Sequence, residues 1–380
     1  MTYARARLWL GITGVGSLVV IAIVALALGL PETLNLQESS TALSSFLSLL
    51  AAAGVFAIWL VPFDFLGGFW LPKTFGRSDR GFLAWAKQYV PAVLFQSLTF
   101  ASFGWLILLA SQQFGSLGSF LAVSGSAIAC FYARHLLLAR KQDHTEQSTQ
   151  RIQEAIRYAT KWDIEIPKTM VVDHEDNGFT GGIVGSLFNP QIVIPKKWLS
   201  LSTEQLATAI SRRAIAINSG SYWLGVVFAF TWNTFGFLFC SWLMGAELSS
   251  VAGLLTTVLG FTVWSFLGLL VLPTLSRNAS LKIDQVLKRQ GTPSVVISLT
   301  AQSMDQLQDN EPERADLVET IFHPIPSVSS RQKYRIIKGP TAWNVARTAL
   351  FLSWGCLGLL SRSVHCNVGR PELWTMLPTD

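Results

Sequence analysis

Charged side chains are scarce in this sequence. Asp, Glu, Lys and Arg make up 14% of its 380 residues and hydrophobic residues make up 50%, whereas soluble domains carry roughly 25% charged residues. The charges are also concentrated, because segments 139–213 and 274–340 hold 35 of the 52 charged residues. The remaining 238 residues hold only 17. This distribution predicts a membrane protein that carries two polar segments.

Cysteine and histidine are rare as well. The four cysteines are scattered and form no C-x-x-C pair, so neither a disulfide framework nor a cysteine zinc site is indicated. None of the five histidines has another histidine four residues away, and G-x-S-x-G and phosphate-loop motifs are absent. The net charge of +6 comes without the basic and aromatic motifs of nucleic-acid-binding modules, so nucleic acid is excluded as a partner.

Long apolar runs predict six membrane-spanning helices, since a span needs about 20 apolar residues. Two of the runs are separated only by the polar stretch Ser111–Ser119. A seventh candidate, Thr348–Ser361, has 14 residues between Arg347 and Arg362; it spans only if both arginines snorkel, and otherwise lies at the interface. The six predicted spans are Leu8–Leu30, Thr41–Val61, segments near 90–110 and 119–138, Ser221–Gly245 and Ser250–Leu272.

The predicted spans hold almost no ionisable side chains, which argues against a transporter or channel. Arg134 and His135 fall at a predicted helix end, where snorkelling is the simplest interpretation. Basic residues flank the spans on one side only, and the alternate loops hold Glu32, Glu38 and Glu247. The positive-inside rule therefore places the N-terminus and both polar segments in the cytoplasm, and we expect a multi-pass protein of the bacterial inner membrane. The flanking basic residues are Arg5, Arg7, Lys73, Arg77, Arg80 and Lys87.

The expected fold is mostly α-helical, with the lipid bilayer as the surrounding partner. The two polar segments together would form one small α+β domain. The expected parts are a membrane domain 1–138 with four spans, a first part of the α+β domain at 139–220, spans five and six in 221–273, a second part of that domain at 274–340, and a hydrophobic C-terminal segment and tail at 341–380.

The first polar segment has the pattern of a helix, two strands and a second helix. Apolar residues at helical spacing predict a helix over 149–161. Ile166–Val172 and Gln191–Pro195 read as strands, and the turn-rich stretch Asp173–Gly185 lies between them. The run Ser202–Gln205 has the form of a capping box, so a helix is predicted to begin at Ser202 and to run toward the fifth span.

The runs Asn177–Gly182 (NGFTGG) and Asn189–Pro195 (NPQIVIP), followed by helix 202–218, resemble the core of HtpX-type membrane zinc metallopeptidases, gluzincins of the H-E-x-x-H class. In that family an N-A-F segment precedes an edge strand, a capped helix carries H-E-x-x-H, two membrane helices follow, and a later helix with E-x-x-x-D supplies the third zinc ligand. The chain has the same order, with 276–290 as the later helix. His323-Pro324 falls where the family often has a His-Pro stretch. The resemblance covers about 145–335 and rests on order and pattern.

On this resemblance, the zinc-binding positions hold residues that cannot bind zinc. H-E-x-x-H falls on Arg212, Arg213 and Ala216, and the third ligand falls on Ser280, while Asp284 is retained. A zinc peptidase needs three protein ligands and one open position, and a guanidinium group cannot ligate a cation. The resemblance therefore implies a degenerate member without catalytic residues, bound metal or other cofactor. Its expected role is binding, scaffolding or regulation.

An alternative is an active zinc metalloendopeptidase with a rebuilt metal site. His174 and His323 are the residues that such a site could use. This alternative would keep proteolysis as the function in spite of the lost motif.

Two expectations concern the interior of the α+β domain. In the family, substrate adds as a strand along the edge strand above the metal, so Gln191, Ile192, Val193 and Ile194 are expected to form an edge that binds an extended peptide, for example a segment of another membrane protein. Arg212 or Arg213 is expected to bridge to Asp284 and to join helices 202–218 and 276–290. The alternative is that both arginines reach the cytoplasm or lipid headgroups.

Overall fold

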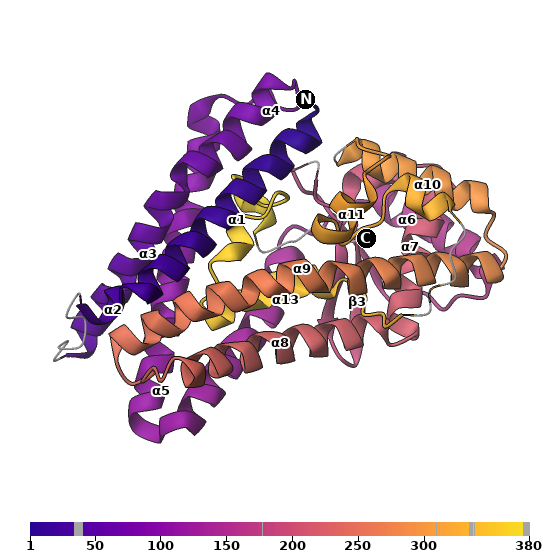
Figure 1. The fold of residues 1–380 in the computed structure, drawn as a ribbon. Helices are drawn as coiled ribbons and strands as arrows, with labels where there is room; N and C mark the ends of the chain where they lie inside the picture. The colour runs from indigo at the N-terminus through magenta and orange to yellow at the C-terminus, as the bar shows by residue number, and fades with distance from the viewer. Residues whose placement is uncertain (34–40, 177, 309, 334–336, 338, 375–380) are drawn as a thin grey trace. The chain divides into compact units, whose positions relative to one another are not determined.

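The computed structural model describes residues 1–33, 41–176, 178–308, 310–333, 337 and 339–374. These residues are mostly helical (Figure 1). They divide into two compact units. Those in Met1–Phe131, Phe230–Gly268 and Ala349–Thr375 form unit 1, and those in Tyr132–Ala229 and Leu269–Thr348 form unit 2. Asn177, the first residue of the NGFTGG run, lies outside the described residues.

Unit 1 consists of long apolar helices and a C-terminal segment. Helix α1 runs alongside α3 (Figure 1), and Trp232 stacks on Trp264 with ring centroids 4.6 Å apart, which holds α8 against α9. A π-helical turn, Leu66–Trp70, continues α3 into α4. The helices that lie wholly or partly in unit 1 are α1 (Tyr3–Ala27), α2 (Leu30–Thr33), α3 (Ala42–Phe65), α4 (Leu71–Thr74), α5 (Phe82–Ala139), α8 (Ser221–Leu243), α9 (Val251–Arg289) and α13 (Val345–Leu352).

Five helical stretches of the described chain are long and apolar enough to cross a membrane: α1, α3 with α4, α5, α8 and α9. The 58 residues of α5 would extend for about 87 Å as a straight helix, although a bilayer core is roughly 30 Å thick. Gly115, within the predicted polar break, interrupts it with φ 59° and ψ −140°. A Cβ on Gly118 would overlap the carbonyl oxygen of Ala110, yet residues eight apart in a straight helix are about 12 Å apart. The chain therefore folds back near Gly115, where the third and fourth spans were predicted to separate.

Segment Thr348–Ser361 does not form the single helix that a seventh span would require. Helix α13 ends at Leu352, 3-10 turns follow, and Leu357 takes a positive φ of 56°. Neither flanking arginine snorkels, because Arg347 is 6% exposed and Arg362 is 1% exposed. Residues 349–374 instead pack inside unit 1, and their 3-10 turns are Ser353–Cys356, Leu360–Arg362 and Pro371–Leu373.

Two more basic residues that were expected at span ends are buried. Arg7 donates to the carbonyl oxygens of His365, at 2.7 and 3.0 Å, and of Gly67, at 2.8 Å. Arg134 in unit 2 is 7% exposed and donates to the carbonyl oxygen of Ile183 at 2.7 Å. Both side chains therefore satisfy backbone acceptors inside the protein, which corrects the snorkelling interpretation of Arg134.

A buried ion pair ties the C-terminal segment, residues 353–374, to α3. Arg362 Nη2 lies 2.6 Å from Asp64 Oδ2, and each side chain is 1% exposed. The Tyr89 hydroxyl donates to Asp64 Oδ2 at 3.1 Å, and the Gly369 backbone N–H donates to Oδ1 at 2.7 Å. The Asp64 carboxylate thus accepts hydrogen bonds from both the side chain and the backbone of the C-terminal segment.

Unit 2 combines helices with a small sheet, and its hydrophobic core draws on both polar segments of the sequence. Ile194 and Ile210 from the first segment belong to the same core as Ile283 and Ile297 from the second. The predicted sixth span and helix 276–290 form one helix, α9, with Pro273 inside it. The other elements of unit 2 are α6 (Glu146–Ala159), β1 (Thr169–Val172), β2 (Gly182–Ser186), β3 (Asn189–Pro195), α7 (Thr203–Asn218), α10 (Ser294–Leu307), α11 (Asp316–Phe322) and α12 (Val328–Gln332).

Strand β3 lies at the centre of the sheet, so the prediction that Gln191–Ile194 is an edge strand is wrong. The strand order is β1-β3-β2, with β3 parallel to β1 and antiparallel to β2. Ile192 is opposite Thr169 on one side and Ile183 on the other. Because both neighbours pair with β3, no edge remains there for an added peptide. The prediction missed β2, since Gly182–Ser186 lies in a glycine-rich stretch that reads as a turn.

The chain itself also contacts the two outer edges of the sheet. Beyond β1, the Asp143 backbone N–H donates to the carbonyl oxygen of Val171 at 2.9 Å. Beyond β2, the Ile183 carbonyl oxygen accepts from Arg134 at 2.7 Å and from the Tyr222 hydroxyl at 3.4 Å. Peptide binding by strand addition therefore finds no support at these positions of either outer strand.

Candidate functional site

Helix α7 places two arginines inside unit 2. The predicted capping box begins this helix, because the Gln205 backbone N–H donates to Ser202 Oγ and the Ser202 backbone N–H donates to Gln205 Oε1, each at 3.2 Å. Every residue from Leu206 to Ala216 is buried. Arg212 and Arg213 lie within this stretch, and buried charged groups require polar partners.

Arg212, Asp284 and Arg331 form a buried group that we call the arginine–aspartate cluster. Arg212 Nη1 forms an ion pair with Asp284 Oδ1, and Arg331 Nη1 donates to Asp284 Oδ2 at 2.9 Å. The three side chains are 3%, 4% and 6% exposed, respectively. One carboxylate therefore joins three elements, α7, α9 and α12, and forms ion pairs with two guanidinium groups.

Arg213 has a different set of partners. It donates to the carbonyl oxygens of Ala209 and Thr180, each at 2.8 Å. Its guanidinium group lies 5.0 Å from the ring centroid of Trp198, within the range of a cation–π contact. Arg213 is 0% exposed and Arg212 is 3% exposed, so the alternative that both arginines reach the cytoplasm or headgroups is wrong.

The residues at the positions assigned to zinc ligation do not fit a zinc ion. Ala216 offers no ligand atom, and Ser280 lies one turn before Asp284 on α9, where it is 2% exposed. Arg212 cannot ligate a cation and would repel one. Within the described ranges, no group of three or more His, Cys, Asp or Glu side chains is placed to hold a metal ion. No step of zinc chemistry can be assigned to this site.

The two histidines considered for a rebuilt zinc site take part in other contacts. His174 stacks on Phe179 with ring centroids 4.3 Å apart, and its Nδ1 accepts from the backbone N–H of Asp176 at 3.2 Å. His323 is 5% exposed and lines a small pocket that three arginines also line. A cluster of guanidinium groups is a poor environment for a cation, so His323 does not favour the rebuilt site. His174 does not favour it either, because its Nδ1 already accepts a hydrogen bond.

Arg331 is the member of the cluster that sequence reasoning missed. It lies 47 residues after Asp284, on the five-residue helix α12, which has too few residues for an apolar period. The only signal nearby was His323-Pro324, which marks the stretch that the family places before its closing helix. In the structure this stretch leads into α12, and Arg331 on α12 contacts Asp284.

Comparison with solved structures identifies the type of fold. The crystal structure of S. mikatae Ste24p is similar to this chain, with a TM-score of 0.61 and 13% sequence identity, over 77% of this chain and 75% of that chain. Ste24p is a membrane metallopeptidase, and this similarity shows that the chain has the same type of fold. The five long apolar helices of the described chain support a multi-pass membrane protein. No family model and no curated protein match the sequence.

Proposed function

We propose that this protein is a degenerate, HtpX-like member of the membrane metallopeptidase fold that does not hydrolyse peptides and acts instead as a binding, scaffold or regulatory protein. The observation that carries the proposal is the ion pair between Arg212 and Asp284. By the resemblance, Arg212 stands at the position of the first zinc ligand, and Asp284 is the outer aspartate that orients this ligand in an active enzyme.

The arginine–aspartate cluster supplies a reason why unit 2 keeps its fold without the metal. In an active enzyme of this fold, a zinc ion would also join the helices that carry its ligands. Here the Asp284 carboxylate joins α7, α9 and α12 through Arg212 and Arg331. The fold therefore retains a link between these helices while the three ligands and the general base are replaced by arginine, alanine and serine.

Zinc content provides the direct test of this proposal. The purified full-length protein should contain far less than one zinc ion per chain by elemental analysis, and it should not cleave an unfolded protein substrate. Arg212→His alone should change neither result, because Arg213, Ala216 and Ser280 would still leave the site incomplete.

A combined variant serves as the positive control for the assigned positions. Arg212→His, Arg213→Glu, Ala216→His and Ser280→Glu together restore the ligand pattern, and this variant should retain zinc that the single variant does not. One zinc ion per wild-type chain, removed by a chelator together with peptidase activity, would overturn the proposal. A combined variant that gains no zinc would contradict the assignment of the positions.

We further propose that the chain lies in the bacterial inner membrane with its N-terminus and unit 2 on the cytoplasmic side, as the loop charges indicate. Ser200 in unit 2 and Glu247 in the loop between α8 and α9 are both exposed. With the native cysteines replaced, Glu247→Cys should react with a membrane-impermeant maleimide in cells whose outer membrane has been opened. Ser200→Cys should react only after the inner membrane is also broken. The reverse pattern would show the opposite orientation.

A further inference from the structure

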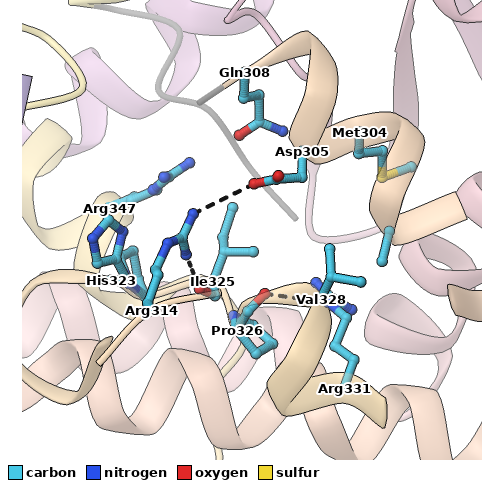
Figure 2. A pocket seen from close by; sticks show the side chains of 12 residues that line it. Met304, Asp305, Gln308, Arg314, His323, Ile325, Pro326, Val328, Arg331 and Arg347 are labelled. Carbon is cyan, nitrogen blue, oxygen red and sulfur yellow. Dashed lines mark hydrogen bonds and ion pairs between the residues drawn. The ribbon is translucent and has the colours of Figure 1, made fainter. Parts of the chain in front are cut away.

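A small pocket of unit 2 borders the arginine–aspartate cluster. It has a volume of about 40 Å³ and lies between α10, the chain around His323 and α12 (Figure 2). A single water needs roughly 10–15 Å³ of such space, so the pocket has room for a few waters or for one small polyatomic group. Arg331 belongs to both features, because it lines the pocket and also donates to Asp284.

The lining of this pocket is strongly basic. Arg314, Arg331 and Arg347 all contribute to it, and Asp305 is the one carboxylate among the described residues that line it. The Arg314 and Arg331 side chains are 7% and 6% exposed, and Arg347 is 6% exposed as a whole residue. Charges of one sign that gather in a poorly hydrated pocket create a strong local potential, and this potential favours a ligand of the opposite sign.

Contacts within the protein itself hold two of the guanidinium groups in place. Arg314 Nη1 donates to the carbonyl oxygen of Ile325 at 3.2 Å, and its Nη2 lies 3.6 Å from Asp305. Arg331 Nε donates to the carbonyl oxygen of Pro326 at 3.4 Å. In Figure 2, Arg347 and His323 lie on one side of Arg314, and Arg331 lies on the opposite side. Such preorganised donors lose little freedom when a ligand binds.

The carboxylate of Asp284 contacts a second arginine besides Arg331. It is shared with Arg212, so two guanidinium groups rely on one aspartate at the boundary of the pocket. Arg314, in turn, lies between two carboxylates, with its Nη2 3.6 Å from Asp305 and its Nε 3.6 Å from Glu311. An oxyanion in the pocket would add attractive contacts to the guanidinium groups that line it.

We propose that this pocket binds a small oxyanion, a carboxylate or phosphate group, through Arg314, Arg331 and Arg347, with the Gln308 amide and the His323 ring as further polar contacts. Guanidinium forks match the geometry of two oxygen atoms on one carbon or phosphorus atom, which distinguishes such a group from a monatomic ion. The proposal does not depend on the absence of zinc. It would hold equally if the protein were an active peptidase.

Calorimetric titration of the full-length protein in detergent micelles tests this site. Inorganic phosphate and acetate are the two probes, and sodium chloride at matched ionic strength is the reference. The wild-type protein should bind at least one of the two oxyanions with saturable heat. Competition of both for one site would indicate a general oxyanion site, and binding of one alone would identify which group the pocket accepts. Equal heat from chloride, or no saturable heat from either probe, would overturn the proposal.

Variants separate the pocket from the general charge of unit 2. Arg347→Gln should weaken binding about tenfold or more, since it removes a charged hydrogen-bond donor. Gln308 is half-buried, and the variant Gln308→Leu keeps all three arginines. This variant should therefore fold normally and weaken binding by a smaller factor. Arg151→Gln removes a guanidinium from α6 that donates to Leu199 and Leu201, outside the pocket, and should leave binding unchanged. Equal losses in Arg151→Gln and in the two pocket variants would also overturn the proposal.

Discussion

Replacing Asp284 with alanine should lower the thermal unfolding temperature of the protein by an amount on the order of 10 °C. The substitution removes the carboxylate that Arg212 and Arg331 share, and both arginines would remain buried and charged. Breaking a buried ion pair from one side costs about 3–5 kcal/mol, because the remaining charge has lost both its partner and its hydration. Unfolding in detergent micelles, followed by intrinsic fluorescence or scanning calorimetry, measures the change.

Asp173→Ala is the matched control for this prediction. Asp173 is in the same unit and lies 3.3 Å from Lys196, but its side chain is 66% exposed and that of Lys196 is 44% exposed. Exposed pairs contribute about 0–1 kcal/mol, since water screens the charges. The control should therefore shift the unfolding temperature by much less than Asp284→Ala. Equal shifts in the two variants would show that the arginine–aspartate cluster does not hold unit 2 together.

The sequence was most informative where the structure depends on local patterns. The capping box at Ser202 predicted the start of α7, and the polar stretch Ser111–Ser119 predicted the break in α5. Both features act over a few residues, through a side chain that caps a helix or a glycine that permits a positive φ. The order of spans and polar segments along the chain was also enough to suggest a peptidase-like membrane fold.

The sheet shows where local patterns mislead. Strand β2 contains Gly182 and Gly185, and glycine weakens the strand pattern because it has no side chain to pack. With β2 read as a turn, the next strand along the chain was assigned to the edge. Only the pairing of β3 with both β1 and β2 reveals its central place, and this pairing depends on the whole chain.

Distant charged contacts were beyond the reach of sequence patterns as well. Asp284 and Arg331 are 47 residues apart, and Asp64 and Arg362 are 298 residues apart. An arginine beside an apolar run reads as a snorkelling residue whenever its partner is unknown. The structure replaces this interpretation for Arg362, which lies within unit 1 and contacts a carboxylate on α3.

The ion pair of Asp64 and Arg362 should be required to keep the C-terminal segment inside unit 1. Asp64→Asn should lower stability by about 3–5 kcal/mol, because Arg362 stays charged and both groups are 1% exposed. Arg362→Met should cost less, since the remaining carboxylate can take up a proton and become neutral. We therefore expect the aspartate variant to unfold at the lower temperature of the two.

Cysteine reactivity distinguishes release of the C-terminal segment from a general loss of stability. Cys356 is 0% exposed in this segment, so a maleimide should label it slowly in the wild-type protein and much faster in Asp64→Asn at temperatures well below unfolding. Arg80→Met is the control, because Arg80 also contacts the segment, at 2.9 Å from Glu372, but its side chain is 35% exposed. This pair should contribute about 1 kcal/mol or less, and its loss should leave Cys356 protected. If Asp64→Asn labels no faster than Arg80→Met, the buried pair does not hold the segment, and the packing of its apolar residues must do so instead.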